Sequence, residues 1–151
     1  MSASSKATTA ELAGYRVGAH VIAKWVALLA VIACALQVAF AAYGFWIAAT
    51  SGGNEALTRS AFGMHTLTGQ ILQYSAAALF VLGLIAWTGW KGWVIPLILA
   101  VLLFVVQGLL VGLGFGVNPW FGALHAFDGM LITAGFVWLM VNRWKDPRKA
   151  S

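Results

Sequence analysis

The sequence predicts an all-α fold: a transmembrane four-helix bundle built from two repeated helical hairpins, with both termini in the cytoplasm. Its composition, its long uncharged runs and the placement of its lysines and arginines carry this prediction. Of the 151 residues, 62% are hydrophobic and only 9% are charged. A soluble domain carries roughly 25% charged residues, so this composition excludes a soluble domain with a large core.

Four long apolar runs, separated by short charged or turn-forming segments, define the predicted helices. A membrane-spanning helix needs about 20 apolar residues, and each run reaches that length. The runs lack the alternation of barrel strands, and a helix satisfies its own backbone in lipid. The predicted parts are a polar or interfacial tail at 1–19, helices near 21–49, 62–88, 93–115 and 121–143 within a transmembrane domain at 20–143, and a basic tail at 144–151.

The positive charges orient the predicted bundle. Arg59 is the one basic residue between the first and second helices, whereas the other basic residues fall on the side that holds both termini. The positive-inside rule places that side in the cytoplasm. The net charge of +5 is then explained by topology, so we expect membrane lipid and no nucleic acid as a partner. The short, Ala-rich chain suggests a bacterial inner (plasma) membrane, crossed several times.

Two pairs of similar stretches indicate an internal duplication. "QVAFAAYGF" at 37–45 matches "QGLLVGLGF" at 107–115, and "FGMHTLTG" at 62–69 matches "FGALHAFDG" at 121–129. The two matches occur in the same order, once in each half of the chain. We therefore predict that helices one and two repeat as helices three and four, related by an axis along the membrane normal.

The duplication places one histidine early in each of helices two and four. His65 and His125 would lie at similar depth near the outer face, on opposite sides of the bundle centre. Polar residues inside a span usually face the bundle interior and pair with a partner. Zinc requires more ligands than this pair supplies, whereas a haem iron needs only two axial ligands. We predict one haem b, with His65 and His125 as its metal ligands.

Several neighbouring residues are candidates for the same site. Gly69 and Gly129 follow the histidines by one helical turn, where a missing side chain would clear the porphyrin or, alternatively, let helices pack closely. Arg59 could pair with the haem propionates or be an ordinary loop charge. Asp128 could accept a hydrogen bond from a ligand histidine, serve as a proton or substrate group, or face the outer water.

The remaining polar residues of the spans have simpler predicted roles. Gln37 and Gln107 lie deeper and are expected to bond across the bundle, with contact to a haem edge or quinone as the alternative. His20 is expected to be interfacial at the inner end, because only Met140 could partner it on a second haem. Cys34 is expected to be a small core residue.

A four-helix unit with a histidine early in helices two and four resembles one half of the haem A synthase family and small uncharacterised four-helix haem-binding membrane proteins. The similarity to cytochrome b561-type proteins is looser. The resemblance implies a haem near the outer face, bound by His65 and His125. The synthase glutamate that precedes a histidine by one turn corresponds here to Ala61 or Phe62, so oxidation of a haem substrate is not implied.

These observations favour a b-type cytochrome with one haem between helices two and four, which transfers electrons to or from quinol or a periplasmic redox protein. No set of residues for covalent or acid–base catalysis is present, so electron transfer is favoured over an enzyme with its own substrate. The alternative is a non-catalytic accessory or pigment-binding subunit of a larger membrane complex. A transporter or haem-handling chaperone is the other alternative, although no helix is clearly broken and Pro96 lies near a helix start.

Overall fold

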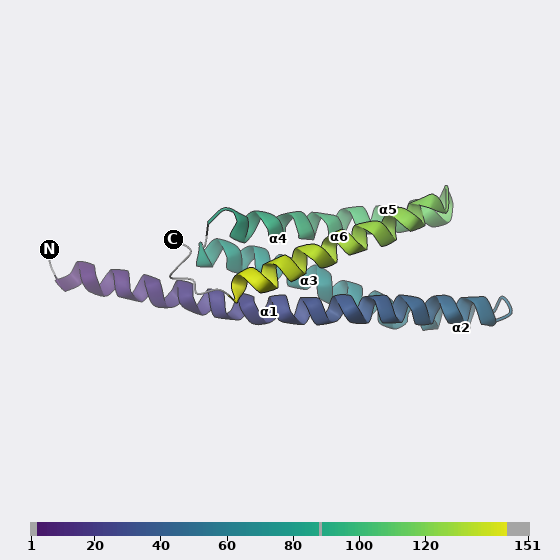
Figure 1. Cartoon of the computed structure of the whole chain (residues 1–151), viewed down its shortest axis with the longest axis horizontal. Helices are drawn as coiled ribbons and strands as arrows, with labels where there is room; N and C mark the ends of the chain where they lie inside the picture. Colours follow the sequence, from purple (N-terminus) through teal and green to yellow (C-terminus); the bar gives the residue numbers. More distant parts are fainter. Residues whose placement is uncertain (1–2, 88, 145–151) are drawn as a thin grey trace.

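The computed structural model describes residues 3–87 and 89–144, with side chains from residue 14 onward, and this part of the chain is all-helical. Four stretches are long and apolar enough to cross a membrane: Gly14–Thr50, Glu55–Ala86, Lys91–Gly116 and Trp120–Arg143. The chain is therefore a multi-pass helical membrane protein. Its elements (Figure 1) are α1 (Ala3–Thr50), α2 (Glu55–Ala61), α3 (Gly63–Ala86), α4 (Lys91–Val101), the π-helical turn η1 (Leu102–Val106), α5 (Gln107–Gly116) and α6 (Trp120–Arg143).

The helix boundaries differ from the predicted ones mainly at the N-terminus. α1 begins at Ala3, so residues 3–19 of the tail predicted at 1–19 belong to the first helix, and residues 1–2 lie outside the described residues. The second predicted helix, near 62–88, corresponds to α3, which the short helix α2 precedes, and the third predicted helix is divided by η1. Of the predicted basic tail at 144–151, only Trp144, the C-cap of α6, lies within the described residues.

Short turns connect the spans and explain where the helices end. Gly52 and Gly53 adopt positive φ between α1 and α2, a conformation that costs glycine little. The side chain of Asn54 then caps α2 by accepting a hydrogen bond from the backbone N–H of Leu57. α3 ends at Trp87 in the left-handed conformation, and Gly89 at positive φ completes the turn into α4.

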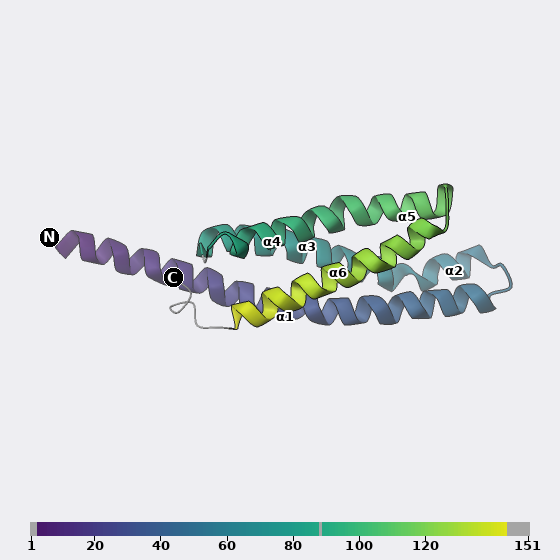
Figure 2. The same ribbon diagram turned by 45° about the horizontal axis from the view of Figure 1, so that its top comes forward.

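The four spans lie at the corners of a square, in which α3 and α6 occupy diagonally opposite corners. α1 packs on α3 and α6, α4 packs on α3, and α5 packs on α6. The start of α1, the turn between α3 and α4, and the end of α6 lie toward one end of the bundle, beyond which α1 projects (Figure 1). At the opposite end, the α1–α2 tip and the α5–α6 tip stand apart in both views (Figure 2).

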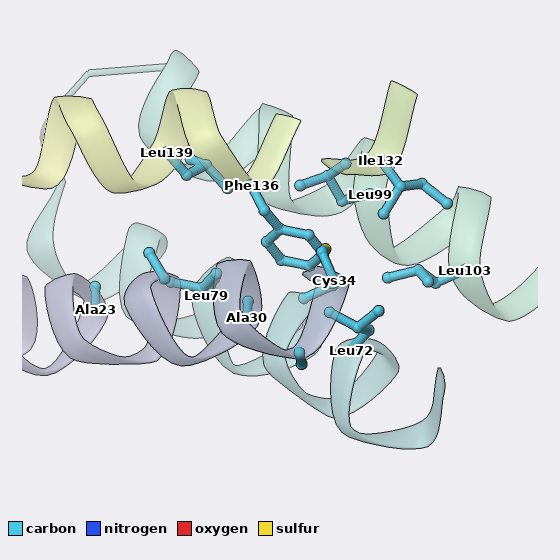
Figure 3. Close-up of a cluster of buried hydrophobic side chains, with 13 residues drawn as sticks. Ala23, Ala30, Cys34, Leu72, Leu79, Leu99, Leu103, Ile132, Phe136 and Leu139 are labelled. Atoms are coloured by element: carbon cyan, nitrogen blue, oxygen red, sulfur yellow. The ribbon is translucent and has the colours of Figure 1, made fainter. Parts of the chain in front are cut away.

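The packed core lies between the middle of the bundle and the α3–α4 turn. Phe136 of α6 and Leu79 of α3 are fully buried there, against a stripe of small residues on α1 that includes Ala30 and Cys34 (Figure 3). The small side chains allow α1 to approach its neighbours closely. α5, by contrast, has no buried residue. The half of the molecule that contains α5 is therefore the more loosely packed half.

Candidate histidine-pair site

His65 of α3 and His125 of α6 face each other between the two diagonal helices. Their ring centroids are 6.4 Å apart and their planes are inclined by 63°. Both side chains are half-buried. α3 and α6 do not pack side by side, so this approach depends on where each histidine stands on its helix rather than on a continuous helix–helix contact. The structure thus brings together the two histidines that the sequence singled out.

The His65 ring is fixed at both of its nitrogens by Gln37 of α1. Its Nδ1 lies 3.2 Å from the backbone carbonyl oxygen of Gln37. A carbonyl only accepts, so Nδ1 carries the proton and Nε2 presents its lone pair. The side-chain amide of Gln37 donates to that Nε2 at 3.3 Å. A hydrogen bond from Nδ1–H to a backbone carbonyl is also the contact that orients metal-ligating histidines.

Thr68 sets the orientation of the Gln37 amide. The Thr68 hydroxyl, which is buried one turn after His65, lies within hydrogen-bond distance of Oε1 of Gln37 and of the backbone carbonyls of Met64 and His65. With its oxygen engaged in this way, the amide turns its NH₂ group toward His65. The sequence did not reveal this contact of Thr68, because nothing in a single threonine indicates that it contacts a glutamine of another helix.

The His125 side has a glutamine and a polar residue at matching positions, but the hydrogen bonds differ. The amide nitrogen of Gln107 donates to Oδ2 of Asp128 at 2.8 Å and to the backbone carbonyl of His125 at 3.1 Å. Asp128 is only 7% exposed, so it does not face the outer water. Within the described part of the chain, the buried Nδ1 of His125 has no hydrogen-bond partner.

Both glutamines bond within their own hairpin, which differs from the prediction that they bond across the bundle. Gln37 of α1 reaches α3, and Gln107 of α5 reaches α6. The physical reason is proximity, because α1 packs on α3 and α5 packs on α6, whereas α1 and α5 occupy separate corners. Each glutamine thus lies beside the histidine of its own hairpin.

The two glycines next to the histidines are not helix-packing glycines. A Cβ at Gly129 would meet nothing within 4 Å, and one at Gly69 would approach only Nε2 of Gln37, at 3.4 Å. A Cβ at Gly114, by contrast, would lie 3.1 Å from the backbone nitrogen of Gly122, where α5 and α6 meet. Close backbone approach therefore explains Gly114 but not Gly69 or Gly129.

Arg59 lies apart from the histidine pair. It is exposed in the last turn of α2 and lines a shallow surface hollow with Glu55, Ala56 and Ser60. Among the described residues, the hydrogen bonds of the two histidines involve Gln37 and Gln107 and not Arg59. The prediction that it pairs with a propionate therefore has no geometric support, although Arg59 and the histidine pair share the same end of the bundle.

His20 lies at the other end of the bundle and is buried within the protein. Its Nε2 donates to the backbone carbonyl of Arg143 at 2.9 Å, which ties α1 to the end of α6. Arg143 is also buried, and its guanidinium donates to the carbonyl of Gly92 at 2.7 Å. Met140 packs on the apolar core. His20 thus forms part of the contact that closes this end of the bundle.

Metal chemistry at the pair is limited by the number of donors. Among the described residues, no group of three or more histidine, cysteine, aspartate or glutamate side chains could hold a metal ion. A protein-only zinc site, which needs at least three such ligands, is therefore not formed there. The two imidazoles suit a metal whose other ligands come from elsewhere.

The fold and the histidine pair together define a multi-pass membrane protein with two imidazoles facing each other between diagonal helices. Comparison of the chain with protein-family models, with curated proteins and with solved structures gives no match.

Proposed function

We propose that this chain is a membrane b-type cytochrome that holds one haem between His65 and His125 and transfers electrons. The separation of the two rings carries the proposal. A metal–imidazole bond is about 2.0–2.1 Å long, and a ring nitrogen lies about 1.1 Å from its ring centre, so two imidazoles on opposite sides of one metal have centroids roughly 6.3 Å apart. The observed separation is 6.4 Å.

The hydrogen bonds of His65 support a ligand role. Its Nδ1–H is held by the Gln37 carbonyl, so its Nε2 is the nitrogen available to a metal. Binding requires the Gln37 amide to release that nitrogen. On the opposite side, His125 has no hydrogen bond at its buried Nδ1 among the described residues, and this leaves its ring less constrained.

Haem fits this donor set better than a bare metal ion does. The porphyrin supplies four nitrogens, so the protein needs to supply only two axial ligands. The open space that a Cβ at Gly129 would enter supports a flat group beside the ring. A bound haem would supply a one-electron change at its iron. Because both axial positions are taken by histidine, the site favours electron transfer over oxygen activation.

The same separation argues against the alternative of a pigment-binding subunit. If each histidine carried its own macrocycle between the rings, the centroids would lie farther apart by at least the usual contact distance of about 3.5 Å. The observed 6.4 Å leaves no such space. A non-catalytic accessory subunit of a larger complex remains the second candidate.

The setting that we propose follows from the charges and the matching stretches. The two hairpins are repeats, each with a glutamine beside a histidine, and both termini face the cytoplasm of a bacterial cell. The haem would then lie near the outer face of the inner membrane. Quinol or a periplasmic redox protein is the partner that this position suits.

The test is the reduced-minus-oxidised absorption spectrum of the purified protein, expressed with an assured haem supply. We expect sharp low-spin b-type bands in the wild type and their loss in His65→Ala and in His125→Ala. His20→Ala is the matched control, because this third histidine lies at the other end of the bundle, and it should keep the bands. A colourless wild-type protein would refute the proposal and favour the accessory subunit.

A further inference from the structure

The third membrane span contains one π-helical turn, η1 (Leu102–Val106), between α4 and α5. The backbone N–H of Gln107 bonds the carbonyl of Leu102, five residues back, rather than that of Leu103. A π-turn contains one residue more than an α-turn, and such turns are frequent at functional sites. Leu103 consequently loses the partner that its carbonyl would have in a regular α-helix.

Gln73 of α3 compensates for that loss. Its side-chain amide donates to the carbonyl oxygen of Leu103 at 3.0 Å, across the α3–η1 contact. Leu103 is buried, so neither water nor lipid would replace this donor. An unpaired carbonyl in the bilayer interior costs several kcal/mol, and a side chain from a neighbouring helix is one of the few ways to satisfy it.

The π-turn is also the point at which the third span changes its neighbour. α4 packs on α3, whereas α5 packs on α6 (Figure 2). The first residue after the turn is Gln107, whose amide bonds Asp128 and the backbone of His125. η1, with its one extra residue, therefore directly precedes Gln107, whose side chain contacts α6, the helix that carries His125.

We infer that Gln73 is a positioning residue for the histidine pair: it stabilises the π-turn, and the π-turn directs Gln107 toward His125 and Asp128. Its effect on haem rests on the proposed function, whereas its effect on the helix does not. α1 provides the contrast, because Gln37 reaches His65 from an uninterrupted α-helix.

A stability cycle tests the link between Gln73 and the π-turn without any haem. Deletion of Val105, which is 58% exposed, converts the π-turn into an α-turn and keeps the flanking helices on their present faces. We expect Gln73→Leu to lower the thermal midpoint of the detergent-solubilised protein, and to have little effect when Val105 is also deleted. Gln70→Leu, an exposed glutamine on the same helix, is the matched control and should change nothing.

Equal destabilisation by Gln73→Leu in both backgrounds would overturn the inference, as would the absence of any effect in the wild type. The second measurement is the haem reduction potential. Gln73→Leu and Gln107→Leu should shift it in the same direction, and the double variant should shift it no further. A potential unchanged in Gln73→Leu would reduce Gln73 to a purely structural residue. If the wild type binds no haem, the proposed function fails, and the stability cycle still decides whether Gln73 stabilises the π-turn.

Discussion

Substitutions at Gly129 can distinguish two roles for this glycine, which are making room for a ligand and letting helices pack closely. A Cβ there would meet nothing within 4 Å, so Gly129→Ala should leave the haem-free protein as stable or raise its stability by about 0.5–1 kcal/mol through higher helix propensity. Gly129→Leu should instead place a side chain where the porphyrin would lie. An added side chain in an occupied space costs typically about 1–3 kcal/mol, which corresponds to a roughly 5- to 150-fold weaker haem affinity.

The assay is a spectroscopic haem titration of the haem-free protein in detergent, paired with its thermal midpoint. Gly112→Leu is the control, because a Cβ at Gly112 also meets nothing within 4 Å but lies on α5, which carries neither histidine, at an exposed position. It should bind haem as the wild type does. Wild-type affinity in Gly129→Leu, or a large loss of stability in Gly129→Ala, would refute the reasoning and return Gly129 to helix packing.

Two further substitutions test the contacts around the site and at the opposite end. Gly83→Ala should destabilise the protein by about 1–3 kcal/mol, because its Cβ would collide with the Gly92 carbonyl oxygen where α3 meets α4; a thermal midpoint equal to that of the wild type would contradict this close contact. Asp128→Leu should cost about 1–3 kcal/mol by removing one acceptor from the buried amide of Gln107, and Asp128→Asn, which keeps an acceptor, should recover most of that loss in the same unfolding measurement.

The spans could be predicted from the sequence because lipid leaves the backbone few choices. Uncharged runs of this length can satisfy their backbone as helices, so their approximate limits follow from the charges alone. The pairing of His65 with His125 followed from their equivalent positions in two similar stretches. These are local or repeated signals, and they require no knowledge of which helix packs on which.

The start of α1 and the π-turn could not be predicted in this way. Residues before 20 are too polar to be identified as part of a span, yet a helix already nucleated in the membrane extends at little cost through alanine-rich sequence. The π-turn depends on Gln73, which is 30 residues away from its acceptor Leu103 in sequence. The one sequence signal for this contact was the presence of a glutamine, Gln73, in the middle of an apolar helix, and that signal does not reveal which residue the glutamine contacts.

The two sides of the histidine pair differ in the hydrogen bonds that their glutamines make, and one difference lies in the residue three positions after each histidine. The Thr68 hydroxyl contacts the oxygen of the Gln37 amide as well as the backbone carbonyls of Met64 and His65, and the NH₂ group of that amide donates to Nε2 of His65. Asp128 as a carboxylate only accepts, so it takes the NH₂ group of Gln107, which then bonds no ring nitrogen of His125. Gln37 therefore contacts both ring nitrogens of His65, through its amide and its backbone carbonyl, whereas Gln107 contacts only the backbone of His125 and the carboxylate of Asp128.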